Sequence, residues 1–451
     1  MPEKRIIIIG GSAAGPKAAA KARRMDQKAE ITMIQKGPDL SMASCGFPYY
    51  VGGVFDERNK LLCTPTGVVR DPNFYMNAKG IKAVTLTEVT KIDREAKKVI
   101  CRHVETGDES VYEYDKLVIS TGTKPFVPPV PGADLEGITT LQSMKDADFL
   151  RKVRDEGKIK KAVVIGGGLI GMETCEALQL AGIQITVVEM LDQILSFMDW
   201  ELAKLMESHA RSKGAMVITE NPVSAFLGEN GKLSAIKLKN GTELPCDLAV
   251  VAVGVRANTK LAREAGLSLG KTGGILVDDY MRTDDPNIYA AGDCCEIKHR
   301  ITGEHMPAYY GDLANLEGRV VGQNVIQGPK VKFPGTIHTA ICKVFDWAAG
   351  STGLNVEFAK QAGYDVESVL IAALDKPGFM GANLLVMKMI ADKKTGRVLG
   401  VQGVGPGDVS KRIAEAAIGI MGGLTVEEFT NLDLPYAPPF SPAIDPIITA
   451  A

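Results

Sequence analysis

A short apolar run near the start of the chain leads into a glycine-rich turn. Arg5–Ile9 is dominated by isoleucine, the pattern of a strand that is buried on both faces of a parallel sheet. Gly10–Gly15 follows, and an alanine-rich helix is predicted to run through Arg24. A second apolar strand is expected at Glu30–Ile34. The predicted order is therefore strand, glycine turn, helix and strand.

The same order returns further along the chain. Lys161–Ile165 predicts a strand, and Gly166–Gly171 follows it. A helix is expected over Met172–Ala181, and the next strand at Ile185–Glu189. Two such units in one chain indicate an internal duplication, in which each half carries its own nucleotide-binding fold.

Three more predicted strands end in small or acidic residues. They are Leu117–Ile119, which runs into Ser120, Thr121 and Gly122; Leu248–Val253, which runs into Gly254; and Ile288–Ala290, which runs into Gly292 and Asp293. Strands that alternate with helices in this way predict an α/β fold with two Rossmann-like, three-layer domains.

Composition excludes some classes of protein. The chain has 451 residues, enough for two or three domains, and its apolar (45%) and charged (24%) contents are those of a globular protein. A net charge near −2 gives no reason to expect nucleic acid or an anionic membrane as a partner. No apolar run is long enough to span a bilayer, and the N-terminus does not have the pattern of a signal peptide. We therefore expect a cytoplasmic protein.

The cysteine pattern gives no reason to expect a metal site or a disulfide scaffold. The eight cysteines are Cys45, Cys63, Cys101, Cys175, Cys246, Cys294, Cys295 and Cys342. None forms a Cys-x-x-Cys pair, so neither a zinc site nor a disulfide framework is expected. The neighbouring Cys294 and Cys295 are too close for an unstrained bridge in ordinary backbone.

The first glycine turn has most of the features of a dinucleotide site. Gly10 permits the tight turn, Ser12 stands where a second glycine is common, and Gly15 allows close packing of helix on strand. The helix N-terminus offers N–H groups to a pyrophosphate. Gln35, 25 residues after Gly10, occupies the position of the expected acidic residue, which weakens the motif. The alternative is a plain strand–helix–strand turn.

The second glycine turn fits the dinucleotide fingerprint fully. Gly166, Gly168 and Gly171 have the required spacing, and Glu189 lies 23 residues after Gly166. A carboxylate there accepts hydrogen bonds from a ribose 2′-hydroxyl and repels a 2′-phosphate, so NADH is favoured over NADPH. The alternative is again a strand–helix–strand unit that binds no nucleotide. With both units present, we expect one bound dinucleotide and one diffusing hydride donor.

One cysteine stands in a distinctive stretch. Ser41–Tyr50 places Cys45 among small and hydroxyl residues, followed by Gly, Phe, Pro and two tyrosines. The stretch comes soon after the first nucleotide unit, where an enzyme needs a redox-active sulfur. A buried structural cysteine is the alternative, because free cysteine is among the most buried residue types.

Taken together, these motifs resemble the FAD-dependent pyridine nucleotide–disulfide oxidoreductase family. The resemblance extends over essentially the whole chain and is to the single-cysteine branch, which includes coenzyme A disulfide reductase, NADH oxidase, NADH peroxidase and persulfide reductase. The motifs that carry it are Gly10–Gly15, Ser41–Tyr50, Ser120–Gly122, Gly166–Gly171, Gly254–Asn258, Ala291–Asp293 and Tyr436–Ser441.

The resemblance implies a domain organisation. An FAD-binding domain is expected over residues 1–147 and 275–328, with an NAD(P)H-binding domain inserted at residues 148–274. Residues 329–451 would form an α+β dimerisation domain. The implied assembly is a homodimer in which Tyr436 reaches the active site of the partner subunit.

The resemblance also implies roles for individual residues. Cys45 would be the redox thiol, and Tyr436 the second catalytic residue. The implied cofactor-binding residues are Gly10, Ser12, Ala13, Ala14, Gly15, Gln35, Lys36, Ser44, Thr121, Gly122, Gly166, Gly168, Leu169, Ile170, Gly171, Glu189, Gly254, Gly292 and Asp293. Candidate substrate-binding residues are Lys21, Arg24, Ser41 and Tyr49. Lys21 and Arg24 share one helix face and could hold the phosphate end of coenzyme A, or form a solvated charged face.

Some residues depart from the family pattern or have two interpretations. Gly378–Ala382 stands where coenzyme A disulfide reductases carry Tyr-Tyr-Pro-Gly-Ala, so both tyrosine hydroxyls are missing. Gly15–Lys17 lacks the histidine of oxidases and peroxidases, which counts against peroxide as the main substrate. His338 and Cys342 are interpreted as structural. Glu173 is expected either to pair with a lysine near the flavin or to lie on a helix surface.

The leading functional hypothesis is an NADH-dependent FAD enzyme that reduces coenzyme A disulfide, persulfide or a related small disulfide through Cys45. One alternative is an NADH oxidase in which Cys45 cycles through sulfenic acid. Another is a flavoprotein subunit that passes electrons to a partner protein. A ferredoxin-type reductase without thiol chemistry is disfavoured by the motif around Cys45.

Overall fold

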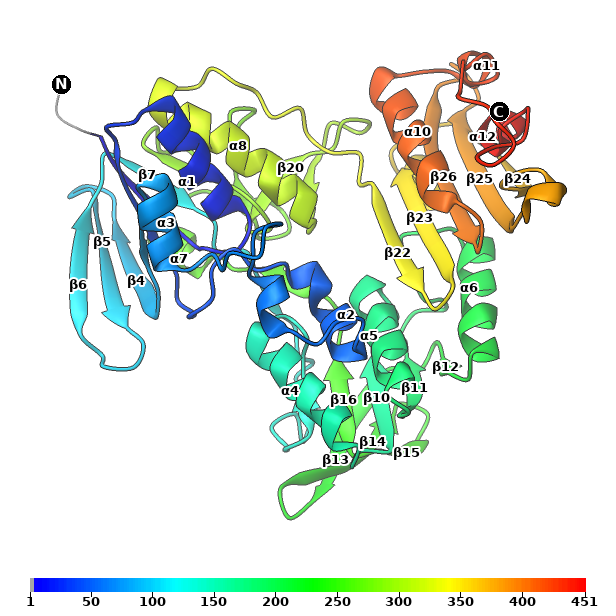
Figure 1. The fold of residues 1–451 in the computed structure, drawn as a ribbon, viewed down its shortest axis with the longest axis horizontal. Helices are drawn as coiled ribbons and strands as arrows, with labels where there is room; N and C mark the ends of the chain where they lie inside the picture. Colours follow the sequence, from blue (N-terminus) through cyan, green and yellow to red (C-terminus); the bar gives the residue numbers. More distant parts are fainter. Residues whose placement is uncertain (1–3) are drawn as a thin grey trace.

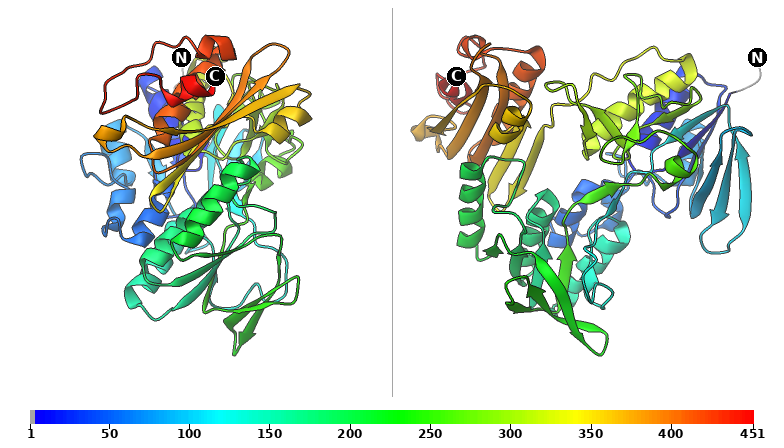
Figure 2. Two further views of the ribbon diagram at one scale, coloured as in Figure 1. Left: turned by 90° about the vertical axis from the view of Figure 1, so that its right-hand side faces the viewer. Right: turned by 180° about the vertical axis from the view of Figure 1, so that it is seen from behind.

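The structure, a computed structural model, describes residues 4–451. Three separate sheets of five strands dominate it, and each lies in its own lobe of the molecule (Figures 1 and 2). The two sheets nearer the N-terminus are parallel, and the third is antiparallel. This arrangement confirms the fold class that the sequence predicts, whereas the exact domain boundaries stay predictions.

The first sheet has the strand order β19-β7-β1-β2-β3. Its strands are β1 (Arg5–Ile9), β2 (Glu30–Ile34), β3 (Lys82–Val84), β7 (Lys116–Ile119) and β19 (Ile288–Ala290). The isoleucines of β1 are buried, because helices cover the sheet and leave its central strand no access to water.

Helices α1 (Ala14–Met25) and α8 (Gly311–Gln327) lie side by side against this sheet (Figure 1). Their backbones approach closely at two glycines of α8. A side chain at Gly318 would collide with the carbonyl oxygen of Ala14, and one at Gly322 with that of Ala18. The close contact fixes where α8 begins relative to the glycine turn of α1.

The second sheet has the order β12-β11-β10-β16-β9. Its strands are β9 (Ile138–Thr139), β10 (Lys161–Ile165), β11 (Gln184–Val188), β12 (Met216–Ile218) and β16 (Leu248–Val251). Helices α4 (Met144–Glu156), α5 (Leu169–Leu180) and α6 (Trp200–Ser212) belong to the same lobe, as does the antiparallel sheet of β13 (Val223–Glu229), β14 (Lys232–Leu238) and β15 (Glu243–Pro245).

The third sheet has the order β22-β23-β26-β25-β24 and is antiparallel throughout. Its strands are β22 (Ala340–Val344), β23 (Trp347–Gly353), β24 (Val366–Leu374), β25 (Leu384–Asp392) and β26 (Val398–Gly405). Helix α10 (Val409–Gly422) packs on β23 and β26, and the short helices α11 (Val426–Phe429) and α12 (Pro446–Ala450) end the chain.

The other elements connect or flank these sheets. The strands are β4 (Thr87–Asp93), β5 (Lys98–His103), β6 (Glu109–Glu113), β8 (Thr123–Pro125), β17 (Val255–Ala257), β18 (Ile275–Leu276), β20 (Cys295–Lys298) and β21 (His305–Pro307). The helices are η1 (Ser44–Gly46), α2 (Phe47–Gly52), η2 (Arg58–Leu61), α3 (Pro72–Lys79), α7 (Lys260–Glu264), α9 (Val356–Gln361) and η3 (Gly378–Met380).

Ion pairs join the second and third lobes. The side chain of Lys388 on β25 is only 8% exposed, and its ammonium lies 3.0 Å from Asp199 and 3.1 Å from Glu201, at the start of α6. On α5, Glu176 accepts hydrogen bonds from the Lys343 ammonium and from the backbone N–H of Phe345, each at 2.8 Å. Several of these charged groups are partly buried, so moving one lobe past the other would leave buried charges without partners.

The element boundaries differ from the predicted ones mainly at turns. The predicted helix over Met172–Ala181 begins earlier, at Leu169, because Gly168 serves as its N-cap. The strand expected at Leu248–Val253 ends at Val251, where the backbone leaves the sheet. Among residues 4–451, none of the helices combines the length and apolar character that a bilayer crossing requires.

Candidate active site

Three loops meet at one edge of the first sheet. Ile9 of β1 pairs in register with Ile119 of β7, which in turn pairs with Ala290 of β19. All three strands are parallel, so the loops after them lie side by side at their carboxyl ends, where α/β proteins bind ligands. The Ser120 hydroxyl donates a hydrogen bond to the carbonyl of Ile9 at 2.8 Å, which ties two of the loops together.

The first glycine turn is packed too tightly for side chains and ends at a helix N-terminus. Gly10 has a φ of +108°, and a side chain there would collide with the carbonyl of Ser120. A side chain at Gly15 would collide with the carbonyl of Gly10. Helix α1 begins at Ala14 with no acidic residue in its first turn and no side-chain cap. Its free N–H groups therefore suit an anion such as a dinucleotide pyrophosphate.

The second glycine turn repeats this geometry. Gly166 has a φ of +104°, and a side chain at Gly171 would collide with the carbonyl of Gly166. The N–H of Gly167 donates to Glu189 Oε2 at 2.7 Å, just as the N–H of Gly11 donates to Gln35 Oε1 at 2.9 Å. The amide of Gln35 thus makes the same contact with its turn that a carboxylate makes in the other unit.

The two halves are also joined directly. Thr121 donates its hydroxyl proton to the carbonyl of Asn258 at 2.7 Å, and β8 pairs with β17 in a small antiparallel sheet. The small-residue turns after β7 and β16, which the sequence shows as a repeat, therefore continue into strands that pair with each other. Lys36, a predicted cofactor contact, forms an exposed ion pair with Glu88 at 2.9 Å.

Two carboxyl groups, the half-buried Asp293 and the buried Glu317, lie where β19 ends. The N–H of Gly292 donates to Glu317 Oε2 on α8 at 2.6 Å, and Glu317 is only 1% exposed. Burial raises the pKa of Asp293 to about 6 and that of Glu317 to about 8. Asp293 is the predicted contact for a bound dinucleotide. Glu317 was not identified from the sequence, because a single acid within a helix gives no sign that it is buried.

The stretch that carries Cys45 is anchored to the first glycine turn. Ser41, with a φ of +52°, donates its N–H to the carbonyl of Gly11 at 2.7 Å. The short helices η1 and α2 follow, and Phe47 on α2 is 1% exposed. The buried aromatic holds the helix in place and leaves Cys45 exposed as a free thiol. This placement excludes the alternative of a buried structural cysteine.

The Cys45 thiol faces the N-terminus of α8. The ideal Cβ position of Gly311, the first residue of α8, lies 3.6 Å from Cys45 Sγ. Partial burial raises the pKa of the thiol, and nearby carboxylates, those of Glu173, Asp293 and Asp312, raise it further. The positive end of the α8 dipole acts in the opposite direction, because it favours the thiolate.

Tyr49 joins this stretch to the second lobe. Its hydroxyl donates to Glu173 Oε1 on α5 at 3.4 Å, and burial raises the pKa of Glu173 to about 7. The expectation that Glu173 pairs with a lysine, or simply lies on a helix surface, is therefore wrong: the residue is half-buried and its partner is a tyrosine. Glu173 stands close enough to Cys45 to influence the charge of the thiol.

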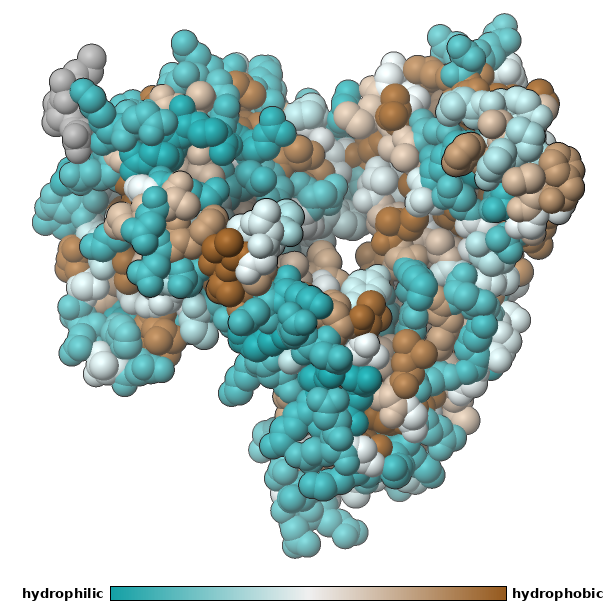
Figure 3. Space-filling model, in the orientation of Figure 1, coloured by the Kyte–Doolittle hydropathy of each residue, from teal (hydrophilic) through white to brown (hydrophobic). Residues whose placement is uncertain are grey.

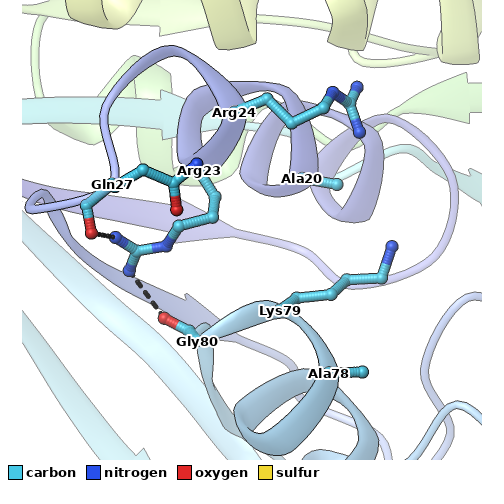
Figure 4. A pocket seen from close by; sticks show the side chains of 7 residues that line it. All are labelled: Ala20, Arg23, Arg24, Gln27, Ala78, Lys79 and Gly80. Carbon is cyan, nitrogen blue, oxygen red and sulfur yellow. Dashed lines mark hydrogen bonds between the residues drawn. The ribbon is translucent and has the colours of Figure 1, made fainter.

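An open cavity of about 530 Å³ lies between α1 and α3 (Figure 4). Its lining residues are Ala20, Arg23, Arg24, Gln27, Ala78, Lys79 and Gly80. Figure 4 shows Arg24 and Lys79 extending toward the same side of it. Burial lowers the pKa of Lys79, and the neighbouring charges of Arg24, Lys17 and Arg70 lower it further. A crowded group of cations of this kind favours a bound anion.

The predicted basic residues of α1 have different surroundings. Arg24 lines the cavity, whereas Lys21 is not among its lining residues and lies beside Gly322 of α8. Arg23 donates to the carbonyl oxygens of Gln27 and Gly80, each at 2.6 Å, and therefore has a structural role. Lys79 was missed from the sequence, since it comes from a separate helix.

Tyr436 lies in an irregular segment before α12 and is 57% exposed. Asp445 anchors the end of this segment: Arg412 on α10 lies 2.8 Å from its Oδ2, and Ser441 donates to the same oxygen at 2.7 Å. Phe379, in place of a family tyrosine, is 79% exposed. Within residues 4–451, all eight cysteines are free thiols and no metal-binding cluster of His, Cys, Asp or Glu is found.

Comparison with known protein families gives two matches along the chain. Residues 4–310 match the description "pyridine nucleotide-disulphide oxidoreductase", and residues 339–447 match the dimerisation domain of the same family. The chain belongs to this family. It is therefore an oxidoreductase of the kind that uses a flavin and a nicotinamide nucleotide, and it carries a dimerisation domain.

Individual relatives resemble the chain over its whole length. The NAD(P)H sulfur oxidoreductase (CoA-dependent) of Pyrococcus furiosus is 33% identical over 100% of this chain and 99% of its own. An NADH oxidase of Methanocaldococcus jannaschii is 33% identical over 99% and 98%. The structure of a NAD-dependent persulfide reductase from A. fulgidus superposes with a TM-score of 0.96 at 44% identity, over 99% of this chain and 82% of that one. The family that the sequence indicates is thus confirmed.

Proposed function

We propose that the protein is an NADH-dependent flavoenzyme that reduces coenzyme A disulfide, coenzyme A persulfide or a related small disulfide through Cys45. The observation that carries the proposal is the exposed Cys45 thiol, held beside the first glycine turn and 3.6 Å from the ideal Cβ position of Gly311. Relatives named as a CoA-dependent sulfur oxidoreductase and a persulfide reductase support it.

The thiol chemistry needs a thiolate at Cys45. Its Sγ attacks one sulfur of the bound disulfide, so that one S–S bond forms with Cys45, the original S–S bond breaks, and the first thiol leaves as a thiolate that takes a proton. The two electrons that reopen the mixed disulfide would come from NADH by way of a flavin held at the first glycine turn. The first turn of α8 favours the thiolate on which the attack depends.

The cofactor assignments rest on the two glycine turns. FAD is proposed for the first, where side chains in place of Gly10 and Gly15 would collide with the backbone and the uncapped N-terminus of α1 suits a pyrophosphate. NADH is proposed for the second. Glu189 accepts two backbone N–H groups, from Gly167 and Leu191, and a carboxylate has further lone pairs for a ribose hydroxyl. Its negative charge opposes a 2′-phosphate, which favours NADH over NADPH.

The cavity between α1 and α3 is proposed to hold the phosphate end of coenzyme A. Arg24 and Lys79 supply positive charge there, and a phosphate would relieve the repulsion that lowers the Lys79 pKa. Arg70 adjoins this group and donates to the carbonyl of Ser41 at 3.2 Å, so it connects the cavity with the Cys45 stretch. An extended substrate could thus run from the cavity to the thiol.

A homodimer with an exchanged tyrosine completes the proposed site. The C-terminal elements α11 and α12 lie at the opposite end of the molecule from α1 and α8 (Figure 1), which supports a role for Tyr436 across the dimer and not within one subunit. Apolar side chains reach the surface of the third lobe (Figure 3), among them Phe379, Phe440 (71% exposed) and Ile444 (61% exposed). Such a surface suits the proposed dimer contact.

The decisive experiment is anaerobic NADH consumption by the purified flavoprotein, with coenzyme A disulfide in one cuvette and coenzyme A persulfide in another. Rapid turnover that is lost in Cys45→Ser, while reduction of a dye by NADH survives, supports the proposal. Persistence of turnover in Cys45→Ser would contradict it. NADH consumption that needs an added partner protein and survives in Cys45→Ser would favour a subunit that passes electrons to that partner.

An oxidase is the second candidate. The NADH oxidase among the relatives and the loss of both tyrosine hydroxyls at Gly378–Ala382 favour it. In that case neither sulfur substrate is reduced, NADH is consumed only when oxygen is admitted, and a sulfenic acid forms at Cys45. Trapping that acid with a dimedone probe during turnover would identify this chemistry.

A further inference from the structure

His338 adopts a backbone conformation that non-glycine residues avoid. It lies between α8 and β22 with a φ of +56°, in the left-handed region where a side chain is strained. Its buried Nε2 atom has no hydrogen-bond partner among the described residues. Glycine would avoid both costs. Strain that persists despite an easy alternative, close to a functional site, is a sign of a functional constraint.

The His338 ring packs between two other rings. Its centroid lies 5.2 Å from that of His299 in an edge-to-face contact, and 6.0 Å from that of Tyr310. Burial lowers the pKa of both histidines, that of His299 to about 4. Both imidazoles are therefore neutral near neutral pH, and His338 acts on Tyr310 by packing and not by charge.

Tyr310 connects this ring cluster to the reactive thiol. It is the N-cap of α8, and the next residue, Gly311, approaches Cys45 Sγ. The start of α8 therefore contacts His338 through Tyr310 and Cys45 through Gly311. The charged groups that face the thiol are the carboxylates of α5, of the β19 loop and of α8 itself, and all of them disfavour the thiolate: Glu173, Asp293 and Asp312. The N-terminus of α8 opposes them only if it is held close.

We propose that His338 is a positioning residue that holds Tyr310 and the first turn of α8 against Cys45, and so sets the reactivity of the thiol. The inference rests on the proposed role of Cys45 as the reacting group. It replaces the purely structural role that the sequence suggested for His338.

The test compares His338→Gly, His338→Phe and the wild-type holoenzyme. Glycine relieves the backbone strain and removes the ring, whereas phenylalanine keeps a ring of similar size without nitrogen. Three quantities are measured: the melting temperature, the rate of Cys45 alkylation by iodoacetamide over a series of pH values, and kcat and KM for coenzyme A disulfide. Peptide mass spectrometry reads out alkylation at Cys45 alone, with Cys45→Ser as the blank.

We expect His338→Gly to melt at the same temperature as the wild type or above it. Its Cys45 alkylation at neutral pH should slow by roughly threefold to tenfold, with the profile moved to higher pH, because the helix dipole no longer favours the thiolate. Its kcat should fall with little change in KM. His338→Phe should behave like the wild type.

Three results would overturn the proposal. One is an unchanged alkylation profile in His338→Gly. Another is a lower melting temperature of that variant, which would show that the histidine supports the fold. The last is a phenylalanine variant as slow as the glycine variant, which would mean that packing is not what matters. If the wild type reduces neither sulfur substrate, the proposed function fails, but the alkylation profiles still decide the role of His338.

Discussion

The hydroxyl of Tyr49 lies 3.4 Å from Glu173 Oε1 and joins the helix that follows Cys45 to the helix that opens the second nucleotide unit. The half-buried carboxyl therefore stands at the junction of the proposed flavin and nicotinamide sites. Its pKa of about 7 places its change of charge within the range of pH in which such an enzyme would operate.

Replacing Glu173 with glutamine should make Cys45 more reactive. The carboxylate raises the pKa of the thiol, so its removal lowers that pKa, and alkylation should accelerate by roughly threefold to tenfold above pH 7. Below pH 7 the wild-type carboxyl takes up a proton, because its own pKa is about 7, and the two proteins should converge. Alkylation of Cys45 as a function of pH provides the measurement.

Glu176→Gln serves as the matched control for that experiment. This residue lies one turn further along α5 and binds Lys343 at 2.8 Å. It should affect the joint with the third lobe. Because the Glu176 charge also raises the pKa of Glu173, the two variants are compared above pH 7, where Glu173 is ionised and Glu176→Gln should leave the rate of Cys45 alkylation unchanged. Equal effects of the two variants would show that the helix, and not the Glu173 charge, acts on the thiol.

Glu317→Gln should stabilise the fold at neutral and alkaline pH. Because burial raises the folded-state pKa of Glu317 to about 8, the folded protein binds the proton more tightly than the unfolded one. Stability is then lost as pH rises from the ordinary glutamate pKa through about 8. Glutamine avoids that loss and can still accept the Gly292 N–H, so we expect a gain of roughly 1–3 kcal/mol near neutral pH.

Denaturant unfolding at acidic and mildly alkaline pH tests this expectation. The gain should vanish at acidic pH, where the wild-type carboxyl is protonated in both states. Glu317→Ala, which removes the acceptor of the Gly292 N–H bond, should be less stable than the glutamine variant throughout. A glutamine variant that is less stable than the wild type at alkaline pH would contradict the raised pKa of Glu317.

Alanine at the last glycine of each turn should separate the two nucleotide sites. Gly15→Ala forces a collision with the Gly10 carbonyl and should yield protein with little bound flavin, whereas Gly171→Ala collides with Gly166 in the other unit. The second variant should keep its flavin and lose affinity for NADH, by about tenfold or more. Flavin absorbance per chain and the KM for NADH distinguish the two; loss of flavin in both would contradict the assignment.

Removing the charge of Lys79 should weaken binding of a substrate that carries the coenzyme A phosphates. Lys79→Gln removes a charge-assisted contact, so KM for coenzyme A disulfide should rise by about tenfold with little change in kcat. Cystine, which has no phosphate, should be unaffected. Lys28→Gln, which changes an exposed lysine outside the cavity lining, is the control. An equal effect on both substrates would place coenzyme A elsewhere.

The sequence predicted the parts of the fold that follow from local pattern. The buried strands Arg5–Ile9, Glu30–Ile34 and Lys161–Ile165 appear with the expected ends, because each is a short apolar run. The first and third stop at Gly10 and Gly166, whose positive φ suits a tight turn. The two nucleotide units and the position of Cys45 beside the first were predictable for the same reason.

The surroundings of the thiol could not be predicted in that way. Gly311, Glu173 and Lys79 come from three distant segments, and only tertiary packing brings the first two to Cys45 and the third to the cavity. Neither the tyrosine partner of Glu173 nor the left-handed backbone of His338 follows from residue type. Lys21 and Arg24 share a face by helical spacing, yet the close approach of α8 at Gly322 gives the two side chains different neighbours.

Two successive turns of helix α5 are attached to other parts of the chain. Glu173 meets Tyr49 beside the reactive thiol, while Glu176, one turn later, binds Lys343 and the Phe345 backbone in the third lobe. Helix α2 packs in the same core as α4 and α5, so a hinge motion of the second lobe would have to displace the Cys45 stretch and break the contacts with the third lobe at once. We therefore expect the molecule to behave as a rigid frame, in which nicotinamide gains access through the movement of individual side chains and not through the closing of a lobe.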